Sequence, residues 1–269
     1  MSIFYEDLLR FYEVAGVDSA LSEEPHNRFQ ESAASAFKRA PVFIVPKDNS
    51  LVQRQVEHQL EIPNNRQISD AQSLANQATT LEELRKAIEA FNGCSLKHTA
   101  KNTCFADGTP GSALMLIGEA PGRDEDLQGL PFVGRSGQLL NRMLEAIGLS
   151  RSGVYIANTV PWRPPGNRTP TPIEMELCRP FIERQIELAK PKLLMAVGGP
   201  AAHALTGSKQ GILRLRGHWS KHITPNKLEM LVMPTLHPAY LLRMPNQKKL
   251  AWQDFLQVKL KLRELGEAI

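Results

Sequence analysis

Cysteine is scarce in this chain of 269 residues, and long apolar runs are missing from it. Three cysteines, a small and odd number, do not indicate a disulfide framework. No apolar run reaches the length of about 20 residues that a membrane-spanning helix needs. A disulfide scaffold and a membrane-embedded protein are therefore not expected, whereas a hydrophobic content of 42% suffices for one sizeable core.

A secretory signal is also missing from the first residues. Residues 1–10 carry Glu6 and Asp7, and they lack both an apolar stretch of the required length and a cleavage site of small residues. We therefore expect a cytoplasmic protein.

Charge is unevenly distributed along the chain. Residues 1–150 contain 14 Lys and Arg against 20 Asp and Glu, a net charge of −6, whereas residues 151–269 contain 18 against 8, a net charge of +10. The C-terminal part could therefore face a polyanion. The alternative is that these charges solvate helix faces such as 248–263.

Residues 1–90 are expected to form a helical N-terminal extension. Residues 3–15 have the spacing of an amphipathic helix. Residues 18–64 lose any sustained period and are rich in polar residues and proline, which is typical of a linker of low order. The helical pattern returns between residues 69 and 93.

Residues 91–269 alternate short apolar runs with helical patterns. The runs predict four strands at residues 113–117, 154–157, 193–197 and 231–233. Strands that alternate with helices predict an α/β fold, here a three-layer α/β/α sandwich around a mostly parallel four-stranded sheet. The loops that follow the strands should gather at one edge of the sheet, where open α/β sheets bind ligands.

The loop after the first predicted strand is acidic and rich in glycine. Residues 118–126 read GEAPGRDED, and the glycines lack the offsets of a dinucleotide-binding loop or of a P-loop. Phe132 follows between Pro131 and Gly134, and Ser136 is a candidate N-cap for the next helix.

Two polar residues follow other predicted strands. Asn158 stands at the end of the second strand, and His237 stands after the fourth. Taken singly, Asn158 is more typical of a turn and His237 of a structural histidine. Their shared position at strand ends suggests that they meet Phe132. Such a set suits a flat, uncharged heterocycle: Phe132 stacks on its face, Asn158 pairs with its edge, and His237 donates to an oxygen that gains negative charge.

Two loops near this edge could contact a nucleic acid. Residues 162–172 form a stiff, proline-rich loop that carries Arg163 and Arg168. After His237, residues 241–243 (Leu-Leu-Arg) offer an apolar wedge and a cation, as proteins that kink a duplex require. The alternative for residues 241–243 is the start of the final helix.

Four segments of the chain strongly resemble the family 4 uracil-DNA glycosylases, within the wider uracil-DNA glycosylase superfamily. They read GEAPGRDEDLQGLPFVGRSGQLLNRML, VYIANTVPWRPPGNRTP, CRPFIERQI and LHPAYLLR. The similarity covers roughly residues 93–256. It implies a monofunctional DNA repair enzyme that flips deoxyuridine out of DNA and hydrolyses the N-glycosidic bond, releasing uracil and leaving an abasic site. Two alternatives are a glycosylase that prefers hypoxanthine or xanthine, and a non-catalytic protein that binds damaged DNA.

The resemblance also implies roles for individual residues. Glu119 and Ala120 would form the pocket wall, Phe132 would stack on the flipped uracil, Asn158 would read its edge, and His237 would stabilise the leaving anion. Two further groups would contact DNA. Ser136 and Gly137 would contact a phosphate, and Leu241, Leu242 and Arg243 would enter the minor groove. Substrates would be single- and double-stranded uracil-containing DNA, bound by a monomer.

Three departures from relatives bear on the chemistry. Ala120 occupies the place at which family 1 relatives carry an aspartate that activates water, which leaves Glu119 and Glu125 as candidate bases. No basic insertion with a histidine follows Trp162, so hydrolytic release is expected rather than a covalent adduct with DNA. The family usually holds a [4Fe-4S] cluster on four cysteines. Phe91 and Trp162 take two of these positions and leave Cys94 and Cys178, so we expect no cluster and no other cofactor. The alternative is that Cys94, Cys104 and Cys178 recruit a fourth ligand such as His98 to hold a cluster or zinc.

Overall fold

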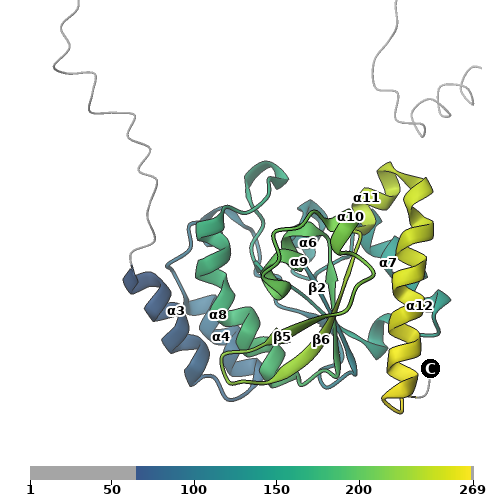
Figure 1. Cartoon of the computed structure of the whole chain (residues 1–269). Helices are drawn as coiled ribbons and strands as arrows, with labels where there is room; N and C mark the ends of the chain where they lie inside the picture. Colours follow the sequence, from purple (N-terminus) through teal and green to yellow (C-terminus); the bar gives the residue numbers. More distant parts are fainter. Residues whose placement is uncertain (1–64, 268–269) are drawn as a thin grey trace, which may run out of the picture. The chain divides into compact units, whose positions relative to one another are not determined.

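The computed structural model describes residues 65–267 (Figure 1). The helix predicted at residues 3–15 and the linker predicted at residues 18–64 lie outside the described residues. None of the described helices is long and apolar enough to cross a membrane.

A six-stranded sheet in the order β1-β3-β2-β4-β6-β5 forms the middle layer. Its strands are β1 (Asp107–Gly108), β2 (Leu114–Gly118), β3 (Tyr155–Asn158), β4 (Leu193–Val197), β5 (Ser220–Ile223) and β6 (Glu229–Thr235). The four inner strands are mutually parallel, and β1 and β5 pair antiparallel at the edges. The inner strands are the four that the apolar runs predict, which confirms the fold class. The edge strands are additions to it.

Helices cover both faces of the sheet (Figure 1). They are α3 (Asn65–Gln77), α4 (Leu81–Ala90), α5 (Leu96–Thr99), α6 (Arg123–Gln128), α7 (Arg135–Ala146), α8 (Pro172–Ala189), α9 (Gly199–Thr206), α10 (Ile212–Leu215), α11 (Pro238–Arg243) and α12 (Lys248–Glu264), with short 3-10 turns at Arg151–Gly153, Pro165–Asn167 and Pro245–Gln247.

Alternate residues of the central strands supply two separate cores, as the period of two of a strand requires. On β2, Leu114 and Leu116 pack with α7 and α12. Met115 and Ile117 face the opposite way and pack with α8 and α9. Because both faces are covered, all five residues of β2 are buried, and the strand reads as a continuous apolar run.

Helices α3 and α4 belong to the same compact body as the sheet. Leu84 and Ile88 of α4 share a hydrophobic cluster with Phe181 of α8, and alanines 71, 75 and 78 join it. The described part of the domain therefore includes α3 and α4, which lie before the boundary near residue 90 that the sequence pattern suggests.

The sheet has a switch point between β2 and β4. Helix α7, which follows β2, packs on one face, whereas α9, which follows β4, packs on the other. Connections that leave neighbouring strands in opposite directions open a crevice beyond the carboxyl ends of those strands. The candidate site lies there.

Candidate active site

Gly118 and Asn158 end the neighbouring strands β2 and β3 and are partners in register. A side chain at Gly118 would collide with Asn158 and Phe132, because an added Cβ would lie 2.4 Å from Asn158 Oδ1 and 2.6 Å from Phe132 Cζ. Glycine is therefore required for the close approach of these three residues. Asn158 is 6% exposed, and its amide takes no hydrogen bond from any residue between 66 and 267, which leaves it free for a ligand.

Phe132 has a left-handed backbone conformation with φ of 53°. Such a conformation costs an L-residue roughly 1–2 kcal/mol and is uncommon for a bulky side chain, so it indicates a constraint imposed by the surroundings. The ring is buried and stacks against His237, with 5.5 Å between ring centroids and 27° between planes. The sequence-predicted aromatic and imidazole are therefore in contact.

Glu125 holds the backbone next to Phe132. The acidic loop folds as the short helix α6, whose first turn carries Asp124, Glu125 and Asp126, where the helix dipole favours carboxylates. Oε1 of Glu125 accepts hydrogen bonds from the backbone N–H groups of Val133 (2.9 Å) and Gly134 (3.0 Å). The side chain is buried, and one of its oxygens is committed to the fold.

Glu119 follows β2 directly and lies half-buried at the cavity wall. Burial raises the pKa of its carboxyl group, and a hydrogen bond from the Thr169 side chain offsets part of this rise. Its main chain is fixed, because the Glu119 carbonyl accepts from the Val160 N–H (3.0 Å) and from Thr159 Oγ1 (2.7 Å).

His237 is the N-cap of α11. Its Nδ1 accepts a hydrogen bond from the Ala239 N–H at 3.1 Å, which caps the first turn. Burial, assisted by the positive charge of Arg243, lowers the pKa of His237 to about 4, although the Glu125 carboxylate acts in the opposite direction. The imidazole is therefore neutral at pH 7. Because Nδ1 accepts, the proton lies on Nε2, and His237 can donate one hydrogen bond from there.

These side chains share one cavity of about 470 Å³ at the carboxyl ends of the strands. Its lining includes Glu119, Ala120, Glu125, Phe132, Ser136, Asn158, Arg168, Thr169, His237, Tyr240 and Arg243. A half-open cleft with an aromatic ring, a free amide and a neutral donor matches the chemistry of a planar, uncharged ring.

Ser136 and Gly137 lie at the start of α7. The helix begins at Arg135 with Gly134 as its N-cap, and no side chain caps it, so the predicted capping by Ser136 is wrong. Ser136 nevertheless lines the cavity. Gly137 is buried, and a Cβ there would lie 1.8 Å from the Phe132 carbonyl oxygen. The lack of a side chain at Gly137 lets the Phe132 loop pack on α7, and its predicted contact with a phosphate stays a prediction.

Residues 241–243 form the C-terminal part of α11, a helix separate from α12. Leu241 is fully buried and packs with Leu139, Leu236 and Ala251, so it does not project from the surface as a wedge in this structure. Its role in the minor groove stays a prediction. Leu242 is half-buried and Arg243 is exposed.

The two arginines of the proline-rich loop are tied to the protein. Arg168 pairs with both oxygens of Glu174, with Nη1 to Oε2 at 2.8 Å and Nη2 to Oε1 at 2.6 Å. Arg163 donates from Nε to Asn167 Oδ1 at 2.7 Å and lies 3.9 Å from Asp126. Both therefore stiffen the loop, which reduces their freedom to follow a phosphate chain.

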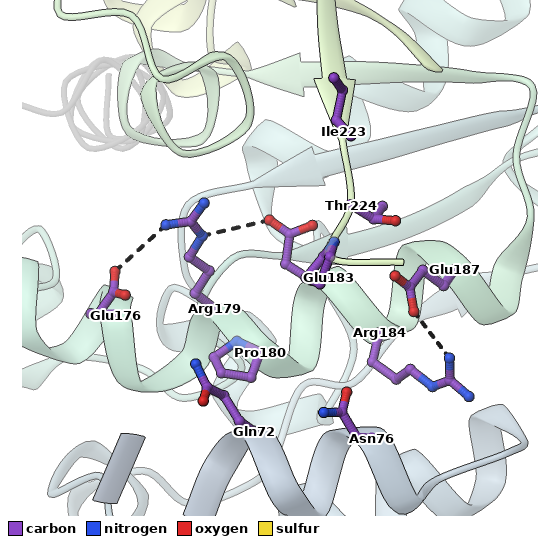
Figure 2. A pocket seen from close by; sticks show the side chains of 11 residues that line it. Gln72, Asn76, Glu176, Arg179, Pro180, Glu183, Arg184, Glu187, Ile223 and Thr224 are labelled. Carbon is purple, nitrogen blue, oxygen red and sulfur yellow. Dashed lines mark hydrogen bonds and ion pairs between the residues drawn. The ribbon is translucent and has the colours of Figure 1, made fainter. Parts of the chain in front are cut away.

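A second cavity, of about 330 Å³, lies between α3, α8 and β5 (Figure 2). Its charged side chains are already paired with each other: Figure 2 shows Arg179 between Glu176 and Glu183, and Arg184 beside Glu187. Glu183 also contacts Nε2 of His222 at 2.8 Å. None of the predicted site residues lines this cavity. Its ion pairs lie within α8, and the Glu183–His222 contact links α8 to β5.

Two residues of the candidate site were not predicted. Thr169 bonds Glu119, and Arg151 contacts the backbone of the Phe132 loop. Thr169 lies within the proline-rich segment and could have been found there. Arg151 lies in a short polar turn, RSG, where the sequence has no distinguishing signal.

Comparisons with known proteins identify the family of the chain. The description "Uracil DNA glycosylase superfamily" belongs to the family model that matches residues 105–256. A type-4 uracil-DNA glycosylase of Sulfurisphaera tokodaii is 36% identical over 187 residues, which covers 67% of this chain and 84% of the relative. A type-4 enzyme of Thermotoga maritima is 34% identical over 189 residues (69% and 96%), and one of Saccharolobus solfataricus is 38% identical over 185 residues (66% and 82%).

The α/β/α sandwich and the polar cleft at the carboxyl ends of its strands indicate an α/β protein that binds a ligand there. The family match identifies the superfamily. The chain belongs to the uracil-DNA glycosylase superfamily. Within that superfamily, the relatives named above are type-4 enzymes.

The residues at the expected cluster positions do not fit an iron-sulfur cluster. Phe91 and Trp162 are buried in the same hydrophobic cluster as Cys94 and Cys178. Phe91 packs edge-on against Phe181 at 5.2 Å, and Trp162 Nε1 donates to Thr103 Oγ1 at 3.0 Å. Two thiols remain where the cluster needs four.

The thiols themselves are engaged. A hydrogen bond from Cys178 lowers the pKa of Cys94, while the same contact and burial raise the pKa of Cys178. Burial and the nearby acids raise the pKa of Cys104 to about 12, and its Sγ donates to the Glu125 carbonyl at 3.1 Å. Residues 65–267 contain no group of three or more His, Cys, Asp or Glu side chains placed to hold a metal ion.

Proposed function

We propose that this protein is a monofunctional uracil-DNA glycosylase, which hydrolyses the bond between uracil and deoxyribose in DNA and leaves an abasic site. The observation that carries the proposal is the convergence of Phe132, Asn158 and a neutral His237 on one cavity in a member of this superfamily. A protein that only binds damaged DNA would not need a donor aimed at a leaving anion.

Recognition of the base uses two features of the cavity. Phe132 offers its ring to the face of a uracil that has been rotated out of the helix. The Asn158 amide carries one donor and one acceptor, which match the O4 and N3–H of uracil. Gly118 keeps the amide and the ring at contact distance.

Bond cleavage then depends on charge. As the bond from C1′ to N1 of uracil breaks, its electron pair moves onto the base, and a water oxygen forms the new bond to C1′. His237 donates from Nε2 to a uracil carbonyl oxygen that gains negative charge. A neutral donor suits this task because it needs no counter-ion, and one well-placed donor is worth about 2.7–4 kcal/mol.

We propose Glu119 as the group that accepts the proton of the attacking water. One oxygen of Glu125, the other candidate, already accepts two backbone N–H groups. Glu119 lines the cavity, and burial raises its pKa toward the range in which a carboxylate is an effective base. Comparison of Glu119→Gln with Glu125→Gln by single-turnover kinetics would separate the two.

The test of the function is an incubation with labelled oligonucleotides that contain uracil, hypoxanthine or xanthine, followed by alkaline cleavage at abasic sites. We expect cleavage of the uracil strand. Hypoxanthine deserves inclusion because its edge also carries an acceptor beside an N–H, so Asn158 alone does not distinguish it. Preferential cleavage of the hypoxanthine or xanthine strand would show that the substrate is another deaminated base. Binding of all three strands without cleavage would contradict the proposal that the protein is an enzyme.

The DNA form, the oligomeric state and the location are part of the same proposal. Both single strands and duplexes should be substrates, and single strands and U:G pairs should react faster because unstacking costs least there. We further propose that the protein acts as a monomer in the cytoplasm.

We propose further that the enzyme works without an iron-sulfur cluster. Aromatic packing of Phe91 and Trp162 joins α4, the loop after β3 and α8, which is the connection that a cluster would otherwise supply.

A further inference from the structure

The Phe132 backbone conformation has to be maintained by contacts, because its φ of 53° is unfavourable for a bulky residue. Glu125 binds the N–H groups after it, at Val133 and Gly134. The carbonyl groups of Pro131 and of Phe132 itself accept from a different partner.

That partner is Arg151, from the turn before β3. Its Nη1 donates to the Phe132 carbonyl at 2.9 Å, and its Nη2 donates to the Pro131 carbonyl at 2.6 Å. Nη1 also donates to Asn141 Oδ1 of α7 at 3.0 Å, and Nε donates to Asp107 Oδ2 of β1 at 2.7 Å. The guanidinium is therefore held from two directions and presents a fixed pair of donors to the loop.

We propose that Arg151 is a positioning residue for uracil excision, which acts through Phe132 by fixing the loop that presents the stacking ring. The proposal rests on the proposed function. Arg151 is absent from the cavity lining, so an effect on excision has to pass through another residue. Gly137 completes the arrangement, because its lack of a side chain leaves room for the same Phe132 carbonyl that Arg151 binds.

A double-mutant cycle tests this directly. The variants are Arg151→Ala, Phe132→Ala and the double variant, measured by single-turnover excision on a uracil-containing duplex. In the wild-type background we expect Arg151→Ala to slow excision by about 100-fold, the scale of a small misplacement of a reacting group. In the Phe132→Ala background the same change should cost no more than about twofold, because coupled sites do not add. An equal loss in both backgrounds would show a general structural role and overturn the proposal.

Arg151→Lys keeps the charge beside Asp107 but cannot span both carbonyls, so it should also slow excision, by less than the alanine variant. It serves as the test if Arg151→Ala does not fold. The matched control is Arg85→Ala on α4, an exposed arginine that pairs with Glu89, which should leave the rate unchanged. A wild-type rate in Arg151→Lys and Arg151→Ala would contradict the proposal.

A second readout does not depend on activity. Hydrogen exchange of a peptide that spans Val133 and Gly134 should be faster in Arg151→Lys than in wild type, and unchanged in Arg85→Ala. Unchanged exchange in Arg151→Lys would contradict the proposal that Arg151 fixes the Phe132 loop, whether or not uracil is released. Faster exchange in a protein that releases no uracil would support this role of Arg151 and reject the proposed function.

Discussion

The chemistry of the candidate site depends on the state of one proton on His237. The Ala239 N–H fixes Nδ1 as an acceptor, and burial keeps the ring neutral, so Nε2 carries the proton. A cationic imidazole would lose the bond to Ala239, and the cap of α11 with it. The same contact thus sets the tautomer and the start of the helix.

Replacement of His237 by alanine should slow uracil release by about 10²–10³-fold, the cost of one donor to a developing anion. Asn158→Ala should slow release by roughly 10- to 100-fold, because both hydrogen bonds to the uracil edge are lost. Affinity for uracil-containing DNA should change much less in both. Single-turnover kinetics with a parallel binding titration would measure this. His203→Ala, an exposed histidine on α9, is the matched control; normal release by His237→Ala and Asn158→Ala would remove both roles.

The low pKa of His237 predicts a specific dependence on pH. Its folded pKa of about 4 lies below the usual value of 6.5, so the unfolded chain binds more protons between these values. The free energy of unfolding should therefore fall as pH is lowered from 6.5 toward 4, and His237→Asn should lose less over this window. Urea unfolding of both proteins at pH 7 and 5 measures the difference. Equal losses would mean that His237 titrates normally when folded.

At the residue scale, sequence patterns predicted which side chains line the candidate site but not how they are oriented. The strand-end rule selected Asn158 and His237 correctly as neighbours, because parallel strands bring their carboxyl ends together. Residue type could not predict which of Leu241 and Leu242 is buried, because tertiary packing decides which side of α11 faces Leu139. Arg151 was missed for the same reason: its partners are backbone carbonyls about 20 residues away, which leave no mark on composition.

At the scale of elements, the four inner strands were predictable because strands buried on both faces are continuous apolar runs. The edges were not. Strand β1 has only two residues, and β5 reads Ser-Lys-His-Ile with one buried position, so neither has an apolar signal. The acidic loop became helix α6 because its carboxylates occupy the first turn, where they favour a helix.

The junction of α4, the loop after β3 and α8 yields a prediction about metal. We expect protein purified without oxygen to be colourless, to contain no stoichiometric iron or zinc, and to be fully active. The reason is that Phe91 and Trp162 fill the space with buried rings, and aromatic packing can hold the segments together. Elemental analysis and an absorption spectrum, with an excision assay on the same sample, provide the measurement. A brown preparation whose activity disappears with its iron would contradict the assignment of the ligand positions.

At the scale of the whole molecule, the structure shows which basic residues of the C-terminal part lie near the cavity. The parallel strands end at the cavity, and α11 places exposed Arg243 at the cavity wall. Arg163 and Arg168 are engaged with Asn167 and Glu174, so they contribute less free charge than the sequence suggests. Arg243 has no ion-pair partner among residues 66–267, which leaves it available for a phosphate.

Affinity for DNA should fall as salt concentration rises, because binding to phosphates releases counterions from the nucleic acid. Arg243→Ala should weaken binding to all sequences alike and reduce the slope of log affinity against log salt by about 1, the contribution of one phosphate contact. Lys221→Ala is the matched control, since Lys221 lies on the edge strand β5, pairs with Glu229, and is in register with Leu231, four residues before the carboxyl end of β6. Binding titrations of a uracil-containing duplex over a salt series would give all three slopes. An affinity of the wild-type protein that does not change with salt would exclude binding through phosphates. An equal reduction of the slope in both variants would show that the charge acts through the net field of the molecule and not through Arg243 at the cavity.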